Sequence, residues 1–367
     1  MNSCGNCFSD KFISDHIDNH ANKNIGQCDF CEEKNVNLVK LVELSDVFQP
    51  VIDIYTIDES GSHLVELLKK DWHLFENLEI KLCTIILCEI FPEIDFRNIK
   101  YSSKIDIDHS RIEQWNKFSN ELIHKNRFFP LSIPDRDHLE YLVSNLWLEN
   151  DEYSKTLYRA RISVVPEPFP IGQMGKPPES SVSEGRANPV GIPYLYTATD
   201  QKTAIAEVRP HKGENVSVAE FVVIKNLRLA DLRNPRKTIS PFSLPEDRLP
   251  QIYSDMEYLC SLGEELSKPV VPRHARLEYL PSQYLCELIK NAGFDGVVYK
   301  SSVGPGDNYA IFNDEKLEGV GVEQYEVSET QIEINKKRNQ LKAFQIRTSM
   351  RKVPYTLQIQ KARFYKS

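Results

Sequence analysis

Four of the eight cysteines form two Cys-x-x-Cys pairs near the start of the sequence, Cys4 with Cys7 and Cys28 with Cys31. Zinc favours four sulfur or nitrogen ligands in a tetrahedron, and a Cys-x-x-Cys turn presents two thiolates from one knuckle. Two such turns complete a closed site, so we predict a structural zinc ion held by Cys4, Cys7, Cys28 and Cys31. Unrelated surface thiols or a redox pair are the alternative, and two matched pairs favour the metal.

The closed coordination shell indicates an architectural site and not a catalytic one. His16 and His20 lie between the two pairs, and we do not expect them to bind the metal because the cysteines already fill the shell. A metal-supported module of this size is unfolded without its ion. Residues 1–50 are therefore expected to form a Cys4 zinc module that serves as a docking element.

A second set of chemically capable residues is spread over more than a hundred positions. Arg186 lies in the Gly- and Pro-rich stretch GRANPVGIP, Tyr196 ends a strand-like run, and Glu207 follows on an expected helix. Ser301 and Ser302 come just after a further strand-like run, GVVYK. Each residue type alone is more often structural or solvated, so only the whole set can carry an assignment.

Taken together and in this order, these residues resemble the RES family, which is named for its Arg, Glu and Ser. The spacing from Tyr299 favours Ser301 over Ser302 as the serine of the family, and Ser302 is kept as a substrate contact. The resemblance covers about half the chain and comprises these features: Gly185-Arg186-Ala187-Asn188 with Gly191, Leu195 to Ala198, Ala204 to Glu207, Gln283, Asp295 to Tyr299 with Ser301, and Ala310 to Phe312.

The resemblance implies an ADP-ribosyltransferase-like fold that breaks the nicotinamide-ribose bond of NAD. Loss of nicotinamide leaves an oxocarbenium-like ribose, whose positive charge Glu207 would stabilise. Arg186 offers a fork of donors for the pyrophosphate of NAD or an incoming phosphate. The ring of Tyr196 can stack on the pyridinium, and Ser301 can hydrogen-bond nicotinamide or ribose. Arg186, Tyr196, Glu207 and Ser301 are thus the expected catalytic residues.

Further arginines lie close to this set in the sequence. Arg209, two residues after Glu207, is either a second substrate contact or a solvent-facing side chain. Arg159 and Arg161, in the run YRARI, present the same alternative. A fold for hydride transfer is not supported, because no G-x-G-x-x-G opens a strand-to-helix turn. NAD would be consumed and not recycled.

These expectations lead to an NAD phosphorylase or NAD glycohydrolase that acts as a toxin or defence effector. One alternative is an ADP-ribosyltransferase that modifies a protein or nucleic acid with the same fold and substrate. The other is a catalytically silent, zinc-anchored protein that binds NAD or regulates a partner. RES toxins are often neutralised by a separate small protein, so an antitoxin or regulatory protein is an expected partner, and a homo-oligomer remains open.

The elements that position this set are expected within residues 151–330, as the catalytic domain. Short strand-like and helix-like runs alternate there, which predicts an α+β domain with an antiparallel or mixed sheet. The Pro-rich residues 164–193 should form a long loop of the kind that binds ligands or acts as a lid. We expect strands at 194–197, 216–223, 296–299 and 309–312, and helices at 202–208, 250–267 and 282–292.

Residues 51–150 show helical spacing of apolar residues, as in HLVELLKKDWHLF and DHLEYLVSNLWL, the second with Asp135 as its expected N-cap. The region resembles the HEPN-associated helical region often attached to RES domains. Many HEPN ribonucleases need an Arg four to six residues before a His, and no Arg stands in that relation to His109, His124 or His138. A helical bundle for scaffolding or sensing is therefore expected.

The composition of the 367 residues excludes some other functions. A net charge of -8 disfavours a general nucleic-acid binder, which needs surplus Lys and Arg. The basic extension 331–367 is expected to be solvated, with contact to nucleic acid or an acidic partner as the alternative. The start MNSCGNCFSDKF is polar and the apolar run from Leu82 to Cys88 is short, so we expect no signal peptide, no membrane span and a cytoplasmic protein.

Overall fold

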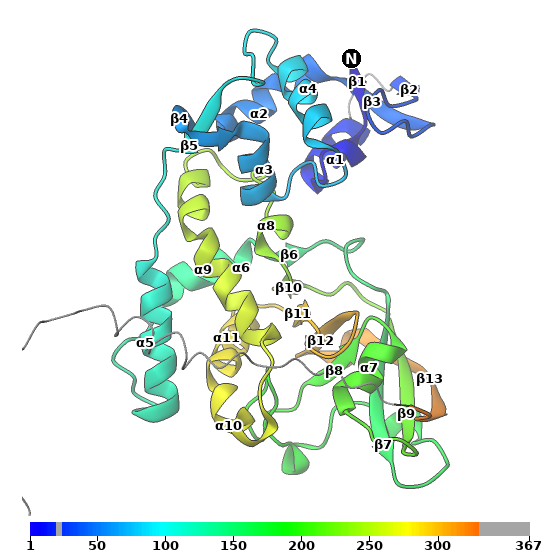
Figure 1. Cartoon of the computed structure of the whole chain (residues 1–367). Helices are drawn as coiled ribbons and strands as arrows, with labels where there is room; N and C mark the ends of the chain where they lie inside the picture. The colour runs from blue at the N-terminus through cyan, green and yellow to red at the C-terminus, as the bar shows by residue number, and fades with distance from the viewer. Residues whose placement is uncertain (20–23, 330–367) are drawn as a thin grey trace, which may run out of the picture. The chain divides into compact units, whose positions relative to one another are not determined.

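The largest element of the computed structural model, which describes residues 1–19 and 24–329, is an eight-stranded mixed sheet (Figure 1). Its strand order is β13-β9-β7-β8-β12-β11-β10-β6, and β10 and β11 pair in parallel while the other pairs are antiparallel. The strands are β6 (Trp147–Leu148), β7 (Thr156–Ser163), β8 (Leu195–Ala198), β9 (Asn215–Val223), β10 (Leu229–Asp231), β11 (Gly296–Lys300), β12 (Asp307–Ile311) and β13 (Leu317–Glu326).

Helices accompany this sheet and complete an α+β architecture, as predicted. The predicted strands and helices of this part are all present, with ends within two residues of the predicted ones. Helices α9 and α11 both pack against β11. The helices are α7 (Gln201–Val208), α8 (Pro235–Thr238), α9 (Leu249–Ser267), α10 (Ala275–Glu278) and α11 (Leu280–Asn291), with 3-10 turns η5 (Pro272–His274) and η6 (Asp314–Lys316).

The N-terminal residues form a small sheet in the order β1-β3-β2 with one helix beside it. The side chain of Asp10 caps that helix by accepting a hydrogen bond from the Ile13 amide. The elements are β1 (Asn2–Ser3), η1 (Gly5–Cys7), α1 (Lys11–Asp18), β2 (Asn24–Gly26), β3 (Val36–Lys40), η2 (Leu41–Leu44) and α2 (Ser45–Ile52).

The next region is helical, but it is not purely a bundle. Two strands, β4 (Tyr55–His63) and β5 (Lys100–Ser103), pair antiparallel across it. Only Tyr55 and Tyr101 of these strands are buried. The other residues are mostly polar and exposed, so the sequence lacks the alternation of apolar and polar residues that would predict a strand. Asp135 caps α6 through the His138 amide, as predicted. The helices are α3 (Leu64–Trp72), α4 (Ile80–Ile90), α5 (Ser110–His124) and α6 (Arg136–Ser144).

Residues Met1–Val327 form one compact unit, because the helical region shares a hydrophobic core with α9 and α11. Asp71 of α3 is 5% exposed and accepts hydrogen bonds from the hydroxyls of Tyr55, at 3.1 Å, and Tyr253, at 3.0 Å. Arg236 of α8 donates to the Asp71 carbonyl. Burial raises the pKa of Tyr253 to about 12, so this hydroxyl remains a donor. These contacts join α3 to α8 and α9 through polar groups as well as apolar ones.

The Pro-rich residues 164–193 form the predicted loop, with only two 3-10 turns, η3 (Ile171–Gln173) and η4 (Glu179–Ser181). In the part of the chain that the structure describes, no helix is both long and apolar enough to cross a lipid bilayer. The basic extension 331–367 lies outside the described residues.

Candidate active site

A cavity of about 400 Å³ opens beside β7, β8 and α7, within the size range of small-molecule sites. Four residues expected from the sequence, Arg186, Tyr196, Glu207 and Arg209, line this cavity. The full lining is Tyr158, Arg159, Ala160, Glu184, Gly185, Arg186, Tyr196, Thr197, Ala198, Ala204, Glu207, Val208, Arg209, Tyr279, Tyr299 and Asn308.

The carboxylate of Glu207 is held from two sides. The Ser301 hydroxyl and the Asn308 amide both donate to its Oε1 atom, at 2.7 and 2.6 Å. Within the described residues, Oε2 accepts no hydrogen bond, so it is available to a ligand. Neither Ser301 nor Ser302 is part of the cavity lining, and the side chain of Ser302 has no hydrogen-bond partner in residues 1–19 and 24–329. The geometry therefore joins Ser301, and not Ser302, to Glu207.

The turn after β11 brings Ser301 to α7, which carries Glu207. Asp200 caps α7 by accepting hydrogen bonds from the Thr203 amide and hydroxyl, at 2.8 and 2.7 Å. The Gly306 amide donates to the same Thr203 hydroxyl at 2.9 Å. A Cβ atom at Gly306 would lie only 2.2 Å from Asp200 Oδ2. This close approach requires glycine, and it fixes the turn against the start of α7.

The loop that carries Arg186 is fastened to α11 and the segment before it. The Arg186 guanidinium donates to the Lys268 carbonyl at 2.8 Å and lies over the Tyr279 ring, 5.1 Å from its centroid. Ser282 donates to the Arg186 carbonyl at 2.6 Å, and Gln283 donates to the preceding carbonyl at 2.8 Å. Arg186 is thus held at the cavity wall with part of its donor fork already used.

The hydroxyl of Tyr196 supports the same loop from beneath. It donates to Asn188 Oδ1 at 2.7 Å and accepts from the Ala187 amide at 2.9 Å. A Cβ atom at Gly185 would lie 2.5 Å from this hydroxyl, so the loop needs glycine there. Burial raises the pKa of Tyr196 well above its ordinary value. The hydroxyl has a structural task, and the ring is the part that a ligand can contact.

The neighbouring arginines differ in their surroundings. Nη1 of Arg159 is buried and has no hydrogen-bond partner among the described residues, and burial lowers the Arg159 pKa to about 10. Arg161 donates to the Gln173 carbonyl and lies over the Phe169 ring, so it stabilises the Pro-rich loop. Arg209 is exposed at the cavity rim, with left-handed backbone at the end of α7.

The cavity carries more positive than negative charge that is free to meet a ligand. Arg159, Arg186 and Arg209 face it together with Glu184 and Glu207. The Glu184 carboxylate is already paired with a further arginine, at 2.6 Å. A buried unpartnered guanidinium is costly, and an anionic ligand would offset that cost. The electrostatics therefore favour a ligand with a phosphate or similar anion.

Several lining residues were not expected from the sequence. Asn308 is 5% exposed within β12, and a polar pair, Asp307-Asn308, at the start of a strand that continues Tyr-Ala-Ile was the signal that could have marked it. The Thr197 hydroxyl is buried without a partner among the described residues, and Thr197 belongs to the cavity lining. Tyr279 lines the wall as well, and no pattern in the sequence singles it out from other tyrosines. Tyr299, which belongs to the RES resemblance, also lines it.

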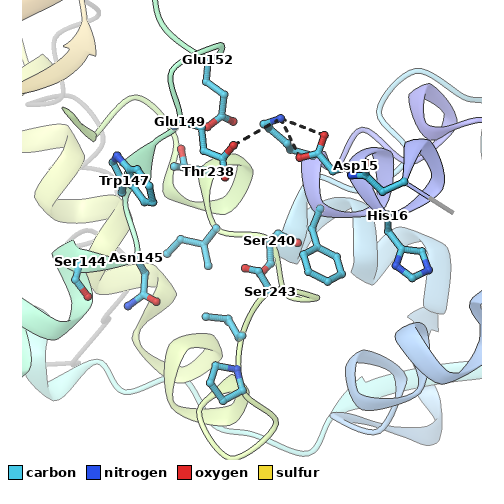
Figure 2. A pocket seen from close by; sticks show the side chains of 16 residues that line it. Asp15, His16, Ser144, Asn145, Trp147, Glu149, Glu152, Thr238, Ser240 and Ser243 are labelled. Carbon is cyan, nitrogen blue, oxygen red and sulfur yellow. Dashed lines mark hydrogen bonds and ion pairs between the residues drawn. The ribbon is translucent and has the colours of Figure 1, made fainter. Parts of the chain in front are cut away.

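A larger cavity, of about 610 Å³, lies between α1, the segment from the end of α6 to Glu152, and residues 238–245 (Figure 2). It contains none of the catalytic residues expected from the sequence. The two cavities have no lining residue in common, so they are separate places for a ligand.

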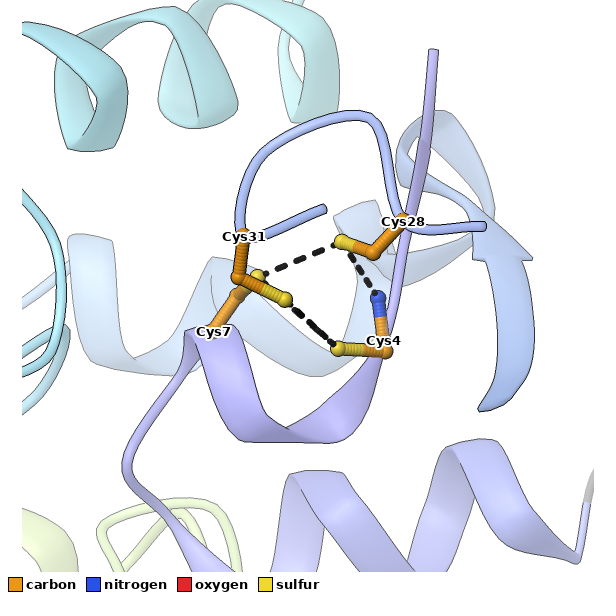
Figure 3. Close-up of side chains that lie close together, drawn as sticks. All are labelled: Cys4, Cys7, Cys28 and Cys31. Carbon is orange, nitrogen blue, oxygen red and sulfur yellow. Dashed lines mark hydrogen bonds between the residues drawn. The ribbon is translucent and has the colours of Figure 1, made fainter. Parts of the chain in front are cut away.

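The four paired cysteines come together at the N-terminus (Figure 3). The Sγ atoms of Cys4 and Cys31 are 3.4 Å apart, those of Cys7 and Cys28 3.5 Å, and those of Cys4 and Cys7 4.0 Å. Thiolates at zinc-sulfur distances of about 2.3 Å in a tetrahedron lie about 3.8 Å apart. The donor set and its spacing thus fit a tetrahedral metal ion.

The pKa values of three thiols in this cluster shift in different directions. The hydrogen bond from Cys7, with others from Cys31 and Cys28, lowers the pKa of Cys4 to about 5, whereas the bond with Cys4 raises the pKa of Cys7 and burial raises that of Cys31. Three of the four cysteines are buried, and Cys31 is partly exposed. His16 stacks on the Phe12 ring and is not part of the cluster.

Comparison with known proteins places this geometry in a family. Residues 156–331 match the RES domain family. The chain carries a RES domain. This RES domain runs from β7 through β13 and contains every residue that lines the smaller cavity. Among solved structures, the M. tuberculosis MbcT-MbcA toxin-antitoxin complex contains a similar chain, with 15% identity and a TM-score of 0.31 over 53% of this chain and 94% of that one. No curated protein matches the sequence.

Proposed function

We propose that the RES domain degrades NAD by breaking its nicotinamide-ribose bond. The observation that carries this proposal is the Glu207 carboxylate, which Ser301 and Asn308 orient at the edge of an arginine-rich cavity. NAD develops positive charge on its ribose during the reaction and carries negative charge on its pyrophosphate, and this pair of charges matches the arrangement. The resemblance to the RES family indicates NAD as the substrate, and the charges of the cavity are complementary to it.

Among the described residues, some would bind the substrate and others would stabilise the charge that develops in the reaction. Arg159 and Arg186 would bind the pyrophosphate, since their guanidinium groups face the cavity. The bond between ribose C1 and the nicotinamide nitrogen breaks, and nicotinamide leaves with the electron pair. Glu207 stabilises the oxocarbenium-like ribose, a charge that exists only in the transition state. Ser301 and Asn308 keep the carboxylate in place during this step.

The reaction ends when an oxygen nucleophile attacks ribose C1. Water gives ADP-ribose and releases one proton, which makes the enzyme an NAD glycohydrolase. Inorganic phosphate gives ADP-ribose with a phosphate on C1, which makes it an NAD phosphorylase. The positive surplus of the cavity favours phosphate, and water is available at any open cavity, so both products belong to the proposal. A role as a toxin or defence effector, held back by an antitoxin or regulatory protein, follows from the RES resemblance.

We also propose that Cys4, Cys7, Cys28 and Cys31 bind a structural zinc ion, since their spacing and chemistry fit it. The ion would hold η1 and the turn around Cys28 together and takes no part in the reaction. Reduced thiolates at this site agree with the proposed cytoplasmic location.

Expression in bacteria tests the proposed activity directly. We expect cellular NAD to fall when the chain is induced and to stay constant for Glu207→Ala and Arg186→Ala at equal protein levels. Glu318→Gln, at an exposed β13 residue that is not part of the lining, is the matched control and should deplete NAD like the parent. Cell death without loss of NAD, or depletion by Glu207→Ala, would show that the proposal is wrong.

A further inference from the structure

The larger cavity is built by three parts of the chain that are far apart in sequence (Figure 2). One wall is α1, which lies in the sequence between the two cysteine pairs of the cluster. Another is the segment that leads from α6 into the RES domain, and the third is the loop after α8, inside the RES domain. Cavities at such junctions are common places for small ligands, and about 610 Å³ is within their usual size.

Trp147 is the first indication of what this cavity binds. Its side chain lies at the cavity wall (Figure 2) and is 53% exposed, whereas Trp72 and Trp115 are 2% and 1% exposed. Backbone pairing of Trp147 with Ala230 fixes the indole at the outer strand of the sheet. A large rigid aromatic held in solvent beside a cavity is typical of a ligand contact, and an indole face is the best aromatic surface for a cation.

The charges in the cavity also favour a cation. Lys11 is the lysine of the cavity lining. The amine of Lys11 already forms ion pairs with Asp15 and Asp151, both at 3.0 Å, and with Glu149 at 3.9 Å. Glu152 has no ion-pair partner in the described part of the chain and accepts a hydrogen bond from the Glu149 amide. Burial raises the pKa of Glu152, although the charge of Lys11 acts to lower it. Among the Lys, Asp and Glu side chains of the lining, the three carboxylates of Asp15, Glu149 and Glu152 outnumber the single ammonium group, so a surplus of negative charge is left to balance a ligand.

The remaining lining is partly apolar. Ile239, Leu244 and Pro245 come from the loop after α8, and Phe12 comes from α1. Hydroxyl groups of Ser240 and other residues of this loop stand between them. Such a surface accepts a hydrocarbon or ring body next to the charged end of a ligand.

We propose that this cavity is a second ligand site, which binds a small organic cation with an apolar body. The ammonium group lies between the carboxylates of Glu149 and Glu152 and the indole of Trp147. The body of the ligand contacts Ile239 and Leu244. The same charges exclude anions such as NAD, so this site is distinct in chemistry from the arginine-rich cavity.

Named contacts connect this site to the carboxylate of Glu207. Thr238, which lines the cation site, donates to Asp231 at 2.9 Å, and Arg233 bridges Asp231 and Asp307, at 2.8 Å to each. Asp307 is followed in β12 by Asn308, the amide donor to Glu207. We therefore expect a bound cation to change NAD turnover. This expectation, unlike binding itself, rests on the proposed function.

The binding test uses the whole chain and two probes with the same ring and opposite charge. Phenethylamine carries an ammonium group and phenylacetate a carboxylate. We expect phenethylamine to change the tryptophan fluorescence saturably, with a Kd on the order of 1 mM, and phenylacetate to cause no saturable change. Trp147→Phe should remove the signal, because the other two tryptophans are buried. Calorimetry of the parent chain gives the same constant independently.

Charge variants decide whether the recognition is the proposed one. Glu149→Gln combined with Glu152→Gln should weaken phenethylamine binding by about tenfold or more, while Glu246→Gln, an exposed neighbour outside the lining, should leave it unchanged. Equal binding of both probes, no binding of phenethylamine, or an unaltered Kd in the double variant would overturn the site.

Thr238→Val should keep binding and lose any effect of phenethylamine on NAD turnover. If phenethylamine changes NAD turnover equally in the parent and in Thr238→Val, the proposed connection to Glu207 is wrong, while the proposed cation site is unaffected. If the chain does not degrade NAD but still binds phenethylamine, only the proposed function is contradicted.

Discussion

The Ser301 hydroxyl donates a 2.7 Å hydrogen bond to Oε1 of Glu207, although the two residues are 94 positions apart in the sequence. The bond forms because the turn after β11 packs against the start of α7, where Thr203 receives the Gly306 amide. It explains why a serine far from the carboxylate belongs to the same site. It also determines which of two adjacent serines matters.

Replacing Ser301 by Ala should lower kcat/KM for NAD about 10- to 100-fold, because a hydrogen bond to a charged group is worth about 1.5–3 kcal/mol. Ser302→Ala is the matched control and should stay within about twofold of the parent. Steady-state release of nicotinamide measures both. A larger loss in Ser302→Ala than in Ser301→Ala would contradict the assigned geometry.

Asp71→Ala should destabilise the protein by about 3 kcal/mol, since it leaves the buried hydroxyls of Tyr55 and Tyr253 without their acceptor. Urea unfolding followed by circular dichroism measures the change. Asp46→Ala, an exposed substitution in α2, should stay within about 0.5 kcal/mol. If both substitutions cost the same, the Asp71 contacts contribute little to holding α3 against α9.

The cap of α7 should make stability depend on acid. Burial acts to raise the pKa of Asp200, but the hydrogen bonds from Thr203 outweigh it, so the pKa lies below its ordinary value. A carboxyl group with a lowered folded-state pKa stabilises the fold above its unfolded pKa of about 3.9 and loses this contribution as pH falls through the folded pKa. Asp200→Ala should therefore cost about 1 kcal/mol at pH 7 and less near pH 3. Urea unfolding of both proteins across this range gives the comparison, and a pH-independent difference would argue against the charged cap.

Removal of metal should unfold the N-terminal module. Elemental analysis of the purified chain should find one zinc ion per molecule, and none for Cys4→Ser combined with Cys28→Ser. A strong chelator should lower the melting temperature by about 10 °C, because the loss of a structural site costs several kcal/mol. Cys260→Ser, outside the cluster, is the control. A metal-free protein with an unchanged melting temperature would contradict the zinc proposal.

The sequence was most informative where residues near one another act together. Arg186, Tyr196 and Glu207 lie within one loop-strand-helix segment, so their order could be read directly. Asn308 and Arg159 could not be assigned in this way, because an amide in a strand and an arginine in YRARI acquire their roles only from the packing of β7, β8 and β12. Tyr279 reaches the cavity from the junction of α10 and α11, and its role likewise depends on packing.

In the fold as well, features that depend on local sequence were predicted and features that depend on tertiary packing were not. Apolar spacing predicted α3 and α6, since each buries one face, and α9 and α11 were expected as the helices between the strand-like runs. The strands β4 and β5 were missed because they are largely exposed and polar, and their pairing depends on tertiary contacts of Tyr55 and Tyr101. The helical region shares one core with the RES domain, but the sequence could not indicate which helices meet there, because apolar faces do not identify their partners.

Identification of the products formed from NAD by the purified chain, with and without inorganic phosphate, tests the central claim most directly. We predict release of nicotinamide together with ADP-ribose, or with ADP-ribose that carries a phosphate on ribose C1 when phosphate is present, and neither product from Glu207→Ala. Intact NAD after prolonged incubation with the folded parent chain, or cleavage at the pyrophosphate instead of the nicotinamide-ribose bond, would contradict the account.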